Sequence, residues 1–333
     1  MLKKITHRII ILFVLASAAF TWISWGTFGH EHINHAAVLA LPPPLQSFFY
    51  NHIDYITQES TVPDLRKYTL SDKAENPRHY IDLENFGSRD SLPKTLEEVK
   101  LKYDTKFIAD NGILPWYIQD MMAKLTIAFR EKRKTEILFL AADLGHYLGD
   151  AHMPLHTSAN HDGQMTNQKG IHALWESRLP ELFGNKYNYY TSEATYIENV
   201  EAETWRIIYN SHQLVDTLLR IDRELKASFP TDNIYEKDAQ GNVKKNKFKQ
   251  TIFTLEYATA LHKKLNGMVE QQMAKSIKAS ADFWYTAWVN AGKPDLSKLD
   301  APELTKQNKP LLKKELKLWK AGKLFGIEVE KEF

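Results

Sequence analysis

The sequence contains no cysteine, and that absence narrows the chemistry open to the protein. It excludes disulfides, thiolate zinc fingers and cysteine nucleophiles, so a metal site would have to use histidine, carboxylate and backbone groups. A large excess of one charge is missing too, because 43 Lys and Arg against 41 Asp and Glu leave a net charge of +2. A charge so close to zero gives no global reason to expect a polyanionic partner.

The glycine-rich motifs of several enzyme classes are missing as well. The chain has no phosphate-binding glycine loop, no G-x-S-x-G element and no G-x-G-x-x-G fingerprint. It also has no internal repeat of fixed period. The 333 residues are near the upper size for a single hydrophobic core, so one large domain or two small ones would fit.

The N-terminus has the layout of a secretory signal peptide. Three cationic residues within the first eight positions precede an apolar run at residues 9–20. We therefore predict a signal peptide at residues 1–24 and an exported protein, periplasmic or secreted. The alternative is an uncleaved membrane anchor, because apolar residues continue nearly to Trp25. The run is short for a membrane-spanning helix, which favours export.

Apolar residues recur at helical spacing through most of the remaining chain. The pattern predicts helices at 31–41, 45–56, 115–132 and 134–152, and long helical segments within 191–227 and 247–292. The polar stretch between the last two segments is predicted to be a loop or a hairpin around Gly241-Asn242.

Histidines are concentrated between His146 and Glu176, where five of the 13 in the chain occur within 31 residues. Even scattering would place about one there. Two pairs in this stretch, His146/Asp150 and His172/Glu176, have the i, i+4 spacing. On a helix that spacing puts both side chains on one face, close enough to bind one ion. The clustering favours a metal site over buried, hydrogen-bonded histidines.

The predicted helix at 134–152 is apolar enough to be central, and it would carry His146 and Asp150 into the interior. Two buried polar groups on such a helix need a partner, which a metal ion would provide. Pro154 is expected to end the helix, and His156 follows in the turn.

Residues 297–333 form a lysine-rich tail in which Leu312, Leu316 and Trp319 share one helical face. We expect this face to lean on the domain. The alternative is peripheral contact with an anionic membrane. No feature of the sequence indicates an obligate protein partner.

Four residues outside the histidine-rich stretch complete a longer order. Trp25 and His30 form a W-G-x3-H element, Asp64 and His79 follow, and H-x3-D-x5-H and H-x3-E come next. This order resembles the zinc-dependent phospholipase C/S1–P1 nuclease superfamily. The resemblance implies an all-α fold, a single multi-helix domain at residues 25–296 with a zinc cluster at the base of a cleft.

The resemblance also implies three Zn²⁺ ions and their ligands. The first ion would be bound by Asp64, His79, His146 and Asp150, the second by His156, His172 and Glu176, and the third by Trp25, His30 and the shared Asp150. In the family the tryptophan binds through its free amine, so the third ion requires Trp25 to be the mature N-terminus. Cleavage after Ser24 would place the bulky Trp22 at the −3 position, which puts the third ion in doubt.

The activity implied is hydrolysis of phosphodiester bonds by zinc-activated hydroxide. Several cations would neutralise the anionic substrate, and zinc lowers the pKa of a bound water towards 7. Asp64 is the predicted catalytic residue, because its carboxylate would orient or deprotonate that water in addition to binding metal.

Two branches of the superfamily compete for the substrate. Glu176 at the last ligand position, and a preceding loop without a Gly-Gly-Asn segment, favour phospholipase C-like action on phospholipid head groups. The alternative is an S1/P1-type nuclease acting on single-stranded nucleic acid. The stretch from His79 to Asp82 resembles the nuclease segment in which an aromatic residue and an aspartate hold a base, so Tyr80 and Asp82 are its predicted substrate contacts. An alternative of another class is a secreted zinc-binding protein with an idle site.

Overall fold

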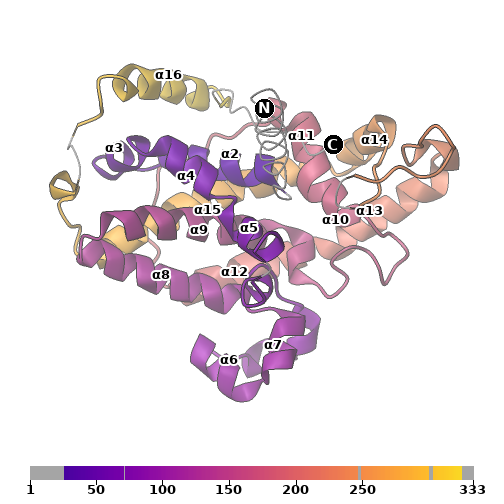
Figure 1. Cartoon of the computed structure of the whole chain (residues 1–333), viewed down its shortest axis with the longest axis horizontal. Helices are drawn as coiled ribbons and strands as arrows, with labels where there is room; N and C mark the ends of the chain where they lie inside the picture. The colour runs from indigo at the N-terminus through magenta and orange to yellow at the C-terminus, as the bar shows by residue number, and fades with distance from the viewer. Residues whose placement is uncertain (1–25, 71, 247–248, 300–302, 325–333) are drawn as a thin grey trace, which may run out of the picture.

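Long helices packed side by side make up the computed structural model (Figure 1). It describes residues 26–70, 72–246, 249–299 and 303–324. Within these ranges the regular elements are helices. Four isolated β-bridges pair residues that lie outside the helices. The all-α prediction is confirmed. The predicted signal peptide at 1–24 and the predicted ligand Trp25 lie outside the described residues.

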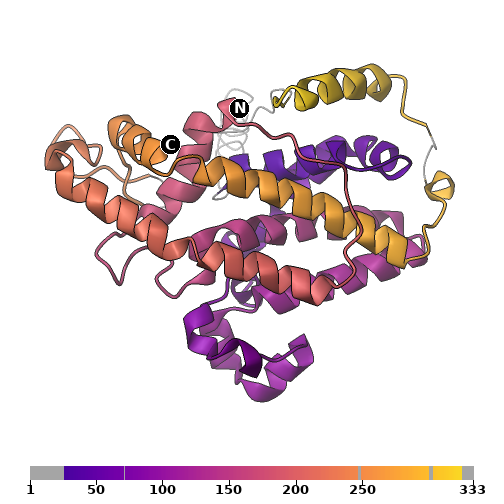
Figure 2. The ribbon, with the colours of Figure 1, turned by 180° about the vertical axis from the view of Figure 1, so that it is seen from behind.

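Four helices form the centre of the fold, and each packs against at least two of the others. They are α2 (Thr27–Leu39), α8 (Leu114–Arg130), α9 (Lys134–His152) and α15 (Met268–Asn290). Figures 1 and 2 show α8, α9 and α15 running side by side. The apolar positions predicted for α9 are buried, and the Trp284 indole Nε1 of α15 donates to the Ala141 carbonyl of α9 at 2.9 Å. This packing places the residues of α9 in the interior of the domain.

The other α-helices surround this centre. They are α3 (Leu45–Tyr50), α4 (Ile53–Glu59), α5 (Val62–Tyr68), α6 (Leu96–Lys102), α7 (Thr105–Asn111), α10 (Ile171–Ala173), α11 (Leu179–Phe183), α12 (Val200–His212), α13 (Val215–Ser228), α14 (Leu255–Lys264) and α16 (Asn308–Lys320). Short 3₁₀ turns lie between several of them, and residues 174–178 form one π-helical turn.

Some helix boundaries differ from the predicted ones. The predicted helix 45–56 is two helices, α3 and α4, because the ladder is interrupted at Asn51 and His52. The Asn51 side chain bonds there to the backbone of Glu303 and Thr305, a long-range contact that helical periodicity does not reveal. As predicted, α9 ends at His152, just before Pro154. The polar stretch near Gly241 is a hairpin-like loop with isolated bridges such as Lys237 to Val243.

The C-terminal helix α16 leans on the domain, as expected. Leu312 and Trp319 are buried, and the Trp319 indole Nε1 donates to the Tyr189 carbonyl at 3.0 Å. Glu315 on the same face lies 3.1 Å from His35 Nε2 of α2. The apolar face that would have served membrane contact is therefore occupied by the protein itself. Nowhere in the described ranges is a helix both apolar and long enough to span a bilayer.

Helices α2 and α9 approach each other closely at Gly145. A Cβ at this position would lie 2.0 Å from Asn34 Oδ1, and Asn34 is fully buried with its amide bonded to Ile56 and Ala142 carbonyls. Gly145→Ala is therefore expected to lower the free energy of unfolding by roughly 1–3 kcal/mol. The measurement is urea unfolding followed by far-UV circular dichroism.

The control for this substitution is Gly29→Ala on α2. A Cβ at Gly29 would meet nothing within 4 Å, so only the helix propensity changes. We expect that variant to be as stable as the parent or up to about 1 kcal/mol more stable. Equal stability of the two variants would contradict the close-approach argument.

Candidate metal centre

Histidines and carboxylates from separate parts of the chain converge beside α9. His30 comes from α2 and Asp64 from the first turn of α5, while α9 contributes His146 and Asp150. The others lie in turns, because His79 follows a 3₁₀ turn at 76–78 and His156 lies in another at 154–157. His172 lies on α10 and Glu176 on the π turn that continues it. All eight described members of the predicted ligand set lie in groups whose ligand atoms are within 4.8 Å of one another.

Asp150 is the centre of one group, which contains four of the histidines. Its carboxylate oxygens lie 3.5 Å from His30 Nε2, 3.0 Å from His79 Nδ1, 3.3 Å from His146 Nε2 and 3.6 Å from His156 Nδ1. The carboxylate is only 1% exposed. Asp64 joins this group through His79, at 3.6 Å. One buried carboxylate surrounded by four imidazoles needs positive charge beside it, from protons on the imidazoles or from a bound cation.

A second group consists of His156, His172 and Glu176. The Glu176 oxygens lie 3.4 Å from His156 Nε2 and 2.9 Å from His172 Nε2. Glu176 also belongs with His30 and Asp150 in a third group. Gly26 lies beside that group, because its amide donates to Ser177 Oγ at 3.0 Å. Trp25 itself lies outside the described residues, so its role as a ligand stays a prediction.

The ring nitrogens of the histidines are oriented as metal ligands are. Nδ1 of His146, His156 and His172 lies 2.6–2.9 Å from a backbone carbonyl, respectively that of Ser60, His79 and His161. These bonds place the proton on Nδ1 and leave the Nε2 lone pair facing the carboxylates. Fixing the tautomer through the second nitrogen is typical of histidines that bind metal. The donor set therefore fits zinc, which prefers imidazole and carboxylate when thiolate is absent.

The electrostatics of the cluster indicate that it needs positive charge. Burial lowers the pKa of His146, but the charges of Asp150 and Asp64 outweigh it and raise that pKa to about 9. Burial likewise lowers the pKa of His156, and Asp150 with Glu176 raises it to about 9. Burial and the adjacent His146 lower the pKa of His30 to about 4. In the ion-free protein, protons on the two raised histidines balance the buried carboxylates, and a metal ion would displace them.

A cavity of about 380 Å³ opens beside these groups. Its wall includes the candidate ligands Asp64, His156, His172 and Glu176, and also Tyr80 and Asp82, the predicted substrate contacts. The cavity therefore connects the metal groups to the residues predicted to select the substrate.

Tyr80 and Asp82 are held firmly in that wall. The Tyr80 hydroxyl donates to the Ala109 carbonyl at 2.8 Å, and the intervening Ile81 amide donates to the His156 carbonyl at 2.8 Å. Asp82 is buried, and among the described residues its Oδ1 has no hydrogen-bond partner. Burial, with a smaller contribution from Glu84, raises the pKa of Asp82 to about 6. Asp82 therefore contributes a carboxylate to the cavity wall, while its Oδ1 is enclosed by the protein.

Sequence reasoning missed other residues of the same wall. They are Lys67, Asn76, Asp110, His161 and Asp162. Lys67 brings a cation to a wall of mostly acidic and imidazole groups, and its position three residues after Asp64 on α5 was the available signal. Asp162 accepts the Gly170 amide at 2.9 Å and so fixes the start of the helix that carries His172.

Comparison with protein families identifies one match that covers most of the chain. The model of the S1/P1 nuclease family matches residues 25–317. Comparison with curated proteins finds no significant match.

Proposed function

The chain belongs to the S1/P1 nuclease family of zinc-dependent phosphodiesterases, and we propose that it acts as a nuclease on single-stranded nucleic acid. One observation carries this proposal, namely that Tyr80 and Asp82 line the same cavity as the candidate zinc ligands. The sequence alone favoured phospholipase C. The placement of Tyr80 and Asp82 favours the alternative, because that reading gives both residues a role in binding.

The proposed zinc ligands follow the groups described above. His79, His146 and Asp150 would hold one ion together with Asp64, which lies 3.6 Å from His79, and His156, His172 and Glu176 would hold another. His30 and Asp150, 3.5 Å apart, would contribute to a third together with Trp25. Bound zinc would supply Lewis acidity to the phosphate oxygens and acidify a water molecule.

The side chains of the cavity wall would bind the substrate and accept a proton. Lys67 would contact a non-bridging phosphate oxygen and offset its charge. Asp64 belongs both to the cavity wall and to a metal group, and one of its carboxylate oxygens would accept a proton from water. The ring of Tyr80 would stack on a base, and the carboxylate of Asp82 would accept an N–H of the base edge.

Phospholipase C remains the second candidate because the wall carries several carboxylates. Asp82, Asp110 and Asp162 would complement the quaternary ammonium group of a phosphocholine head group. A choline head group has no N–H to donate, however, and would leave the Asp82 acceptor without a hydrogen bond.

The discriminating assay compares single-stranded DNA with phosphatidylcholine, each with and without chelator. We expect chelator-sensitive release of nucleotides with the lipid intact. Asp82→Ala should raise KM for DNA roughly 10-fold or more, since a hydrogen bond to a charged group is lost. Hydrolysis of bis(p-nitrophenyl) phosphate, which has no base, should change little.

The matched control is Asp110→Ala, which removes another carboxylate of the same wall. Asp110 is exposed and already paired with Lys106, so KM for DNA should stay close to that of the parent. Release of phosphocholine with DNA intact would overturn the nuclease proposal and support phospholipase C.

A further inference from the structure

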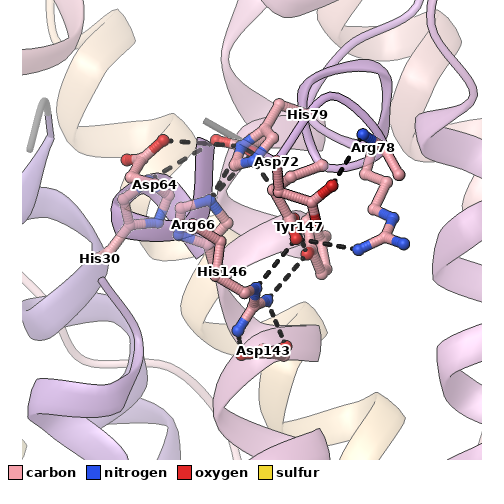
Figure 3. A network of polar contacts seen from close by, with 12 residues as sticks. His30, Asp64, Arg66, Asp72, Arg78, His79, Asp143, His146 and Tyr147 are labelled. Atoms are coloured by element: carbon pink, nitrogen blue, oxygen red, sulfur yellow. Dashed lines mark hydrogen bonds and ion pairs between the residues drawn. The ribbon is translucent and has the colours of Figure 1, made fainter. Parts of the chain in front are cut away.

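A single buried carboxylate, Glu75, contacts the neighbours of three candidate zinc ligands. Asp64 is followed two positions later by Arg66, His79 is preceded by Arg78, and His146 is followed by Tyr147. Figure 3 shows the side chains of Arg66, Arg78, Tyr147 and His79 in one network of polar contacts. These ligands come from three different segments of the chain, and all three segments meet at Glu75.

The contacts of Glu75 use both of its oxygens. Oε2 accepts from Arg66 Nε and from Arg78 NH1, each at 2.9 Å. Oε1 accepts the Tyr147 hydroxyl and lies 3.4 Å from His79 Nε2. The side chain is 0% exposed. Two guanidinium groups and one hydroxyl therefore satisfy the oxygens of this buried carboxylate.

His79 differs from the other candidate histidines in its orientation. It turns Nδ1 towards Asp150 and Asp64, and Nε2 towards Glu75. His146, His156 and His172 instead direct Nδ1 to a backbone carbonyl. At His79 a carboxylate therefore stands where the others have a carbonyl, and a carboxylate makes the ring a stronger base towards a metal.

We propose that Glu75 is a positioning residue for the first zinc site. With an ion bound at Nδ1, the proton of His79 would lie on Nε2 and face the Glu75 carboxylate, 3.4 Å away. Through Arg66, Arg78 and Tyr147, Glu75 also fixes the segments that carry Asp64, His79 and His146. This inference rests on the ligand assignment proposed above.

Glu75→Gln in the full chain tests the proposal, because glutamine keeps the shape and removes the charge. We expect zinc affinity to fall roughly 10- to 100-fold in competition with a chelating dye. Substitution with Co²⁺ should give an altered visible absorption band, since the geometry of the His79 ligand changes. The charge-retaining Glu75→Asp should recover part of the affinity and the parental band.

The matched control is Asp143→Asn. Asp143 is also a buried carboxylate and pairs with Arg66 at 2.6 Å, but it is not bonded to His79. Its loss should lower the melting temperature and leave the cobalt spectrum and zinc affinity near parental values. Equal loss of zinc affinity in both variants would mean that Glu75 acts only through general stability, and the proposal would be overturned.

Two further variants complete the test. His79→Ala must lose zinc if the ligand assignment holds, and zinc retention there would refute the assignment itself. If His79→Ala loses zinc while Glu75→Gln keeps the parental zinc affinity, the role of Glu75 is refuted and the ligand assignment stands.

If Glu75→Gln fails to fold, Tyr147→Phe removes one partner of Glu75 without leaving a charge, and a smaller fall in zinc affinity is expected. Unchanged affinity in a folded Tyr147→Phe would then count against the proposal.

Discussion

Replacing Asp150 with alanine is expected to abolish zinc retention and phosphodiester hydrolysis together. Its carboxylate lies 3.0–3.6 Å from a ring nitrogen of each of four histidines, His30, His79, His146 and His156. Without it the imidazoles are left with no central charge to balance a divalent ion. Activity should therefore fall by more than the ~10–100-fold that loss of an outer-shell partner typically costs.

The measurements for Asp150→Ala are zinc content by elemental analysis after dialysis, and hydrolysis of single-stranded DNA. Asp150→Asn serves as the isosteric variant and should fail in the same way, because an amide carries no charge. Asp282→Asn is the control, since Asp282 is a largely buried aspartate of α15 that pairs with Lys278 and Thr195. A parental zinc content in Asp150→Ala would refute the ligand assignment.

Removing zinc is expected to lower the thermal stability of the protein substantially. An ion that binds only the folded state stabilises it by RT ln(1 + [L]/Kd), or about 4 kcal/mol at a free concentration 1,000-fold above Kd. Chelation should therefore lower Tm by several degrees or more. The measurement is differential scanning calorimetry with and without chelator, and addition of zinc in excess over the chelator should restore Tm. An unchanged Tm would indicate that the histidine cluster binds no ion.

The difference in Tm should also depend on pH in a definite direction. In the zinc-free protein the pKa values of His146 and His156 are raised to about 9, above the value of about 6.5 in an unfolded chain. The stability that their protons contribute is complete below pH 6.5 and is lost as pH rises through 9. Zinc replaces those protons, so the loaded protein does not lose this contribution. The Tm difference should therefore widen between pH 6.5 and 9.

The ligands between His146 and Glu176 were predictable because their signal is local, whereas His30, Asp64 and His79 were assigned only through the family resemblance. The spacing of His146 and Asp150 on an apolar helix, and the proline that ends it, are properties of adjacent residues. The split of residues 45–56 into two helices was not predictable, because it accompanies contacts of Asn51 with residues more than 250 positions away. Periodicity gives no information at that range.

The role proposed for Glu75 was also beyond sequence reasoning. Residues 72–78 are polar and read as an ordinary loop. Only the fold brings this loop against Arg66 of α5 and Tyr147 of α9. There Glu75 is buried and contacts side chains from three segments of the chain. The π-helical turn at Glu176 is likewise invisible to a search for 3.6-residue periodicity, although the i, i+4 spacing survives it.

The packing of α2 has a consequence for the time at which the site can form. This helix carries His30, yet it packs on α15 and α16, and its residue His35 meets Glu315 across a separation of 280 residues. During synthesis the ribosome needs on the order of half a minute to add that many residues. Until then α2 lacks the surfaces that cover it. Zinc would accordingly be acquired late, by a chain that is almost complete, rather than by a growing N-terminal segment.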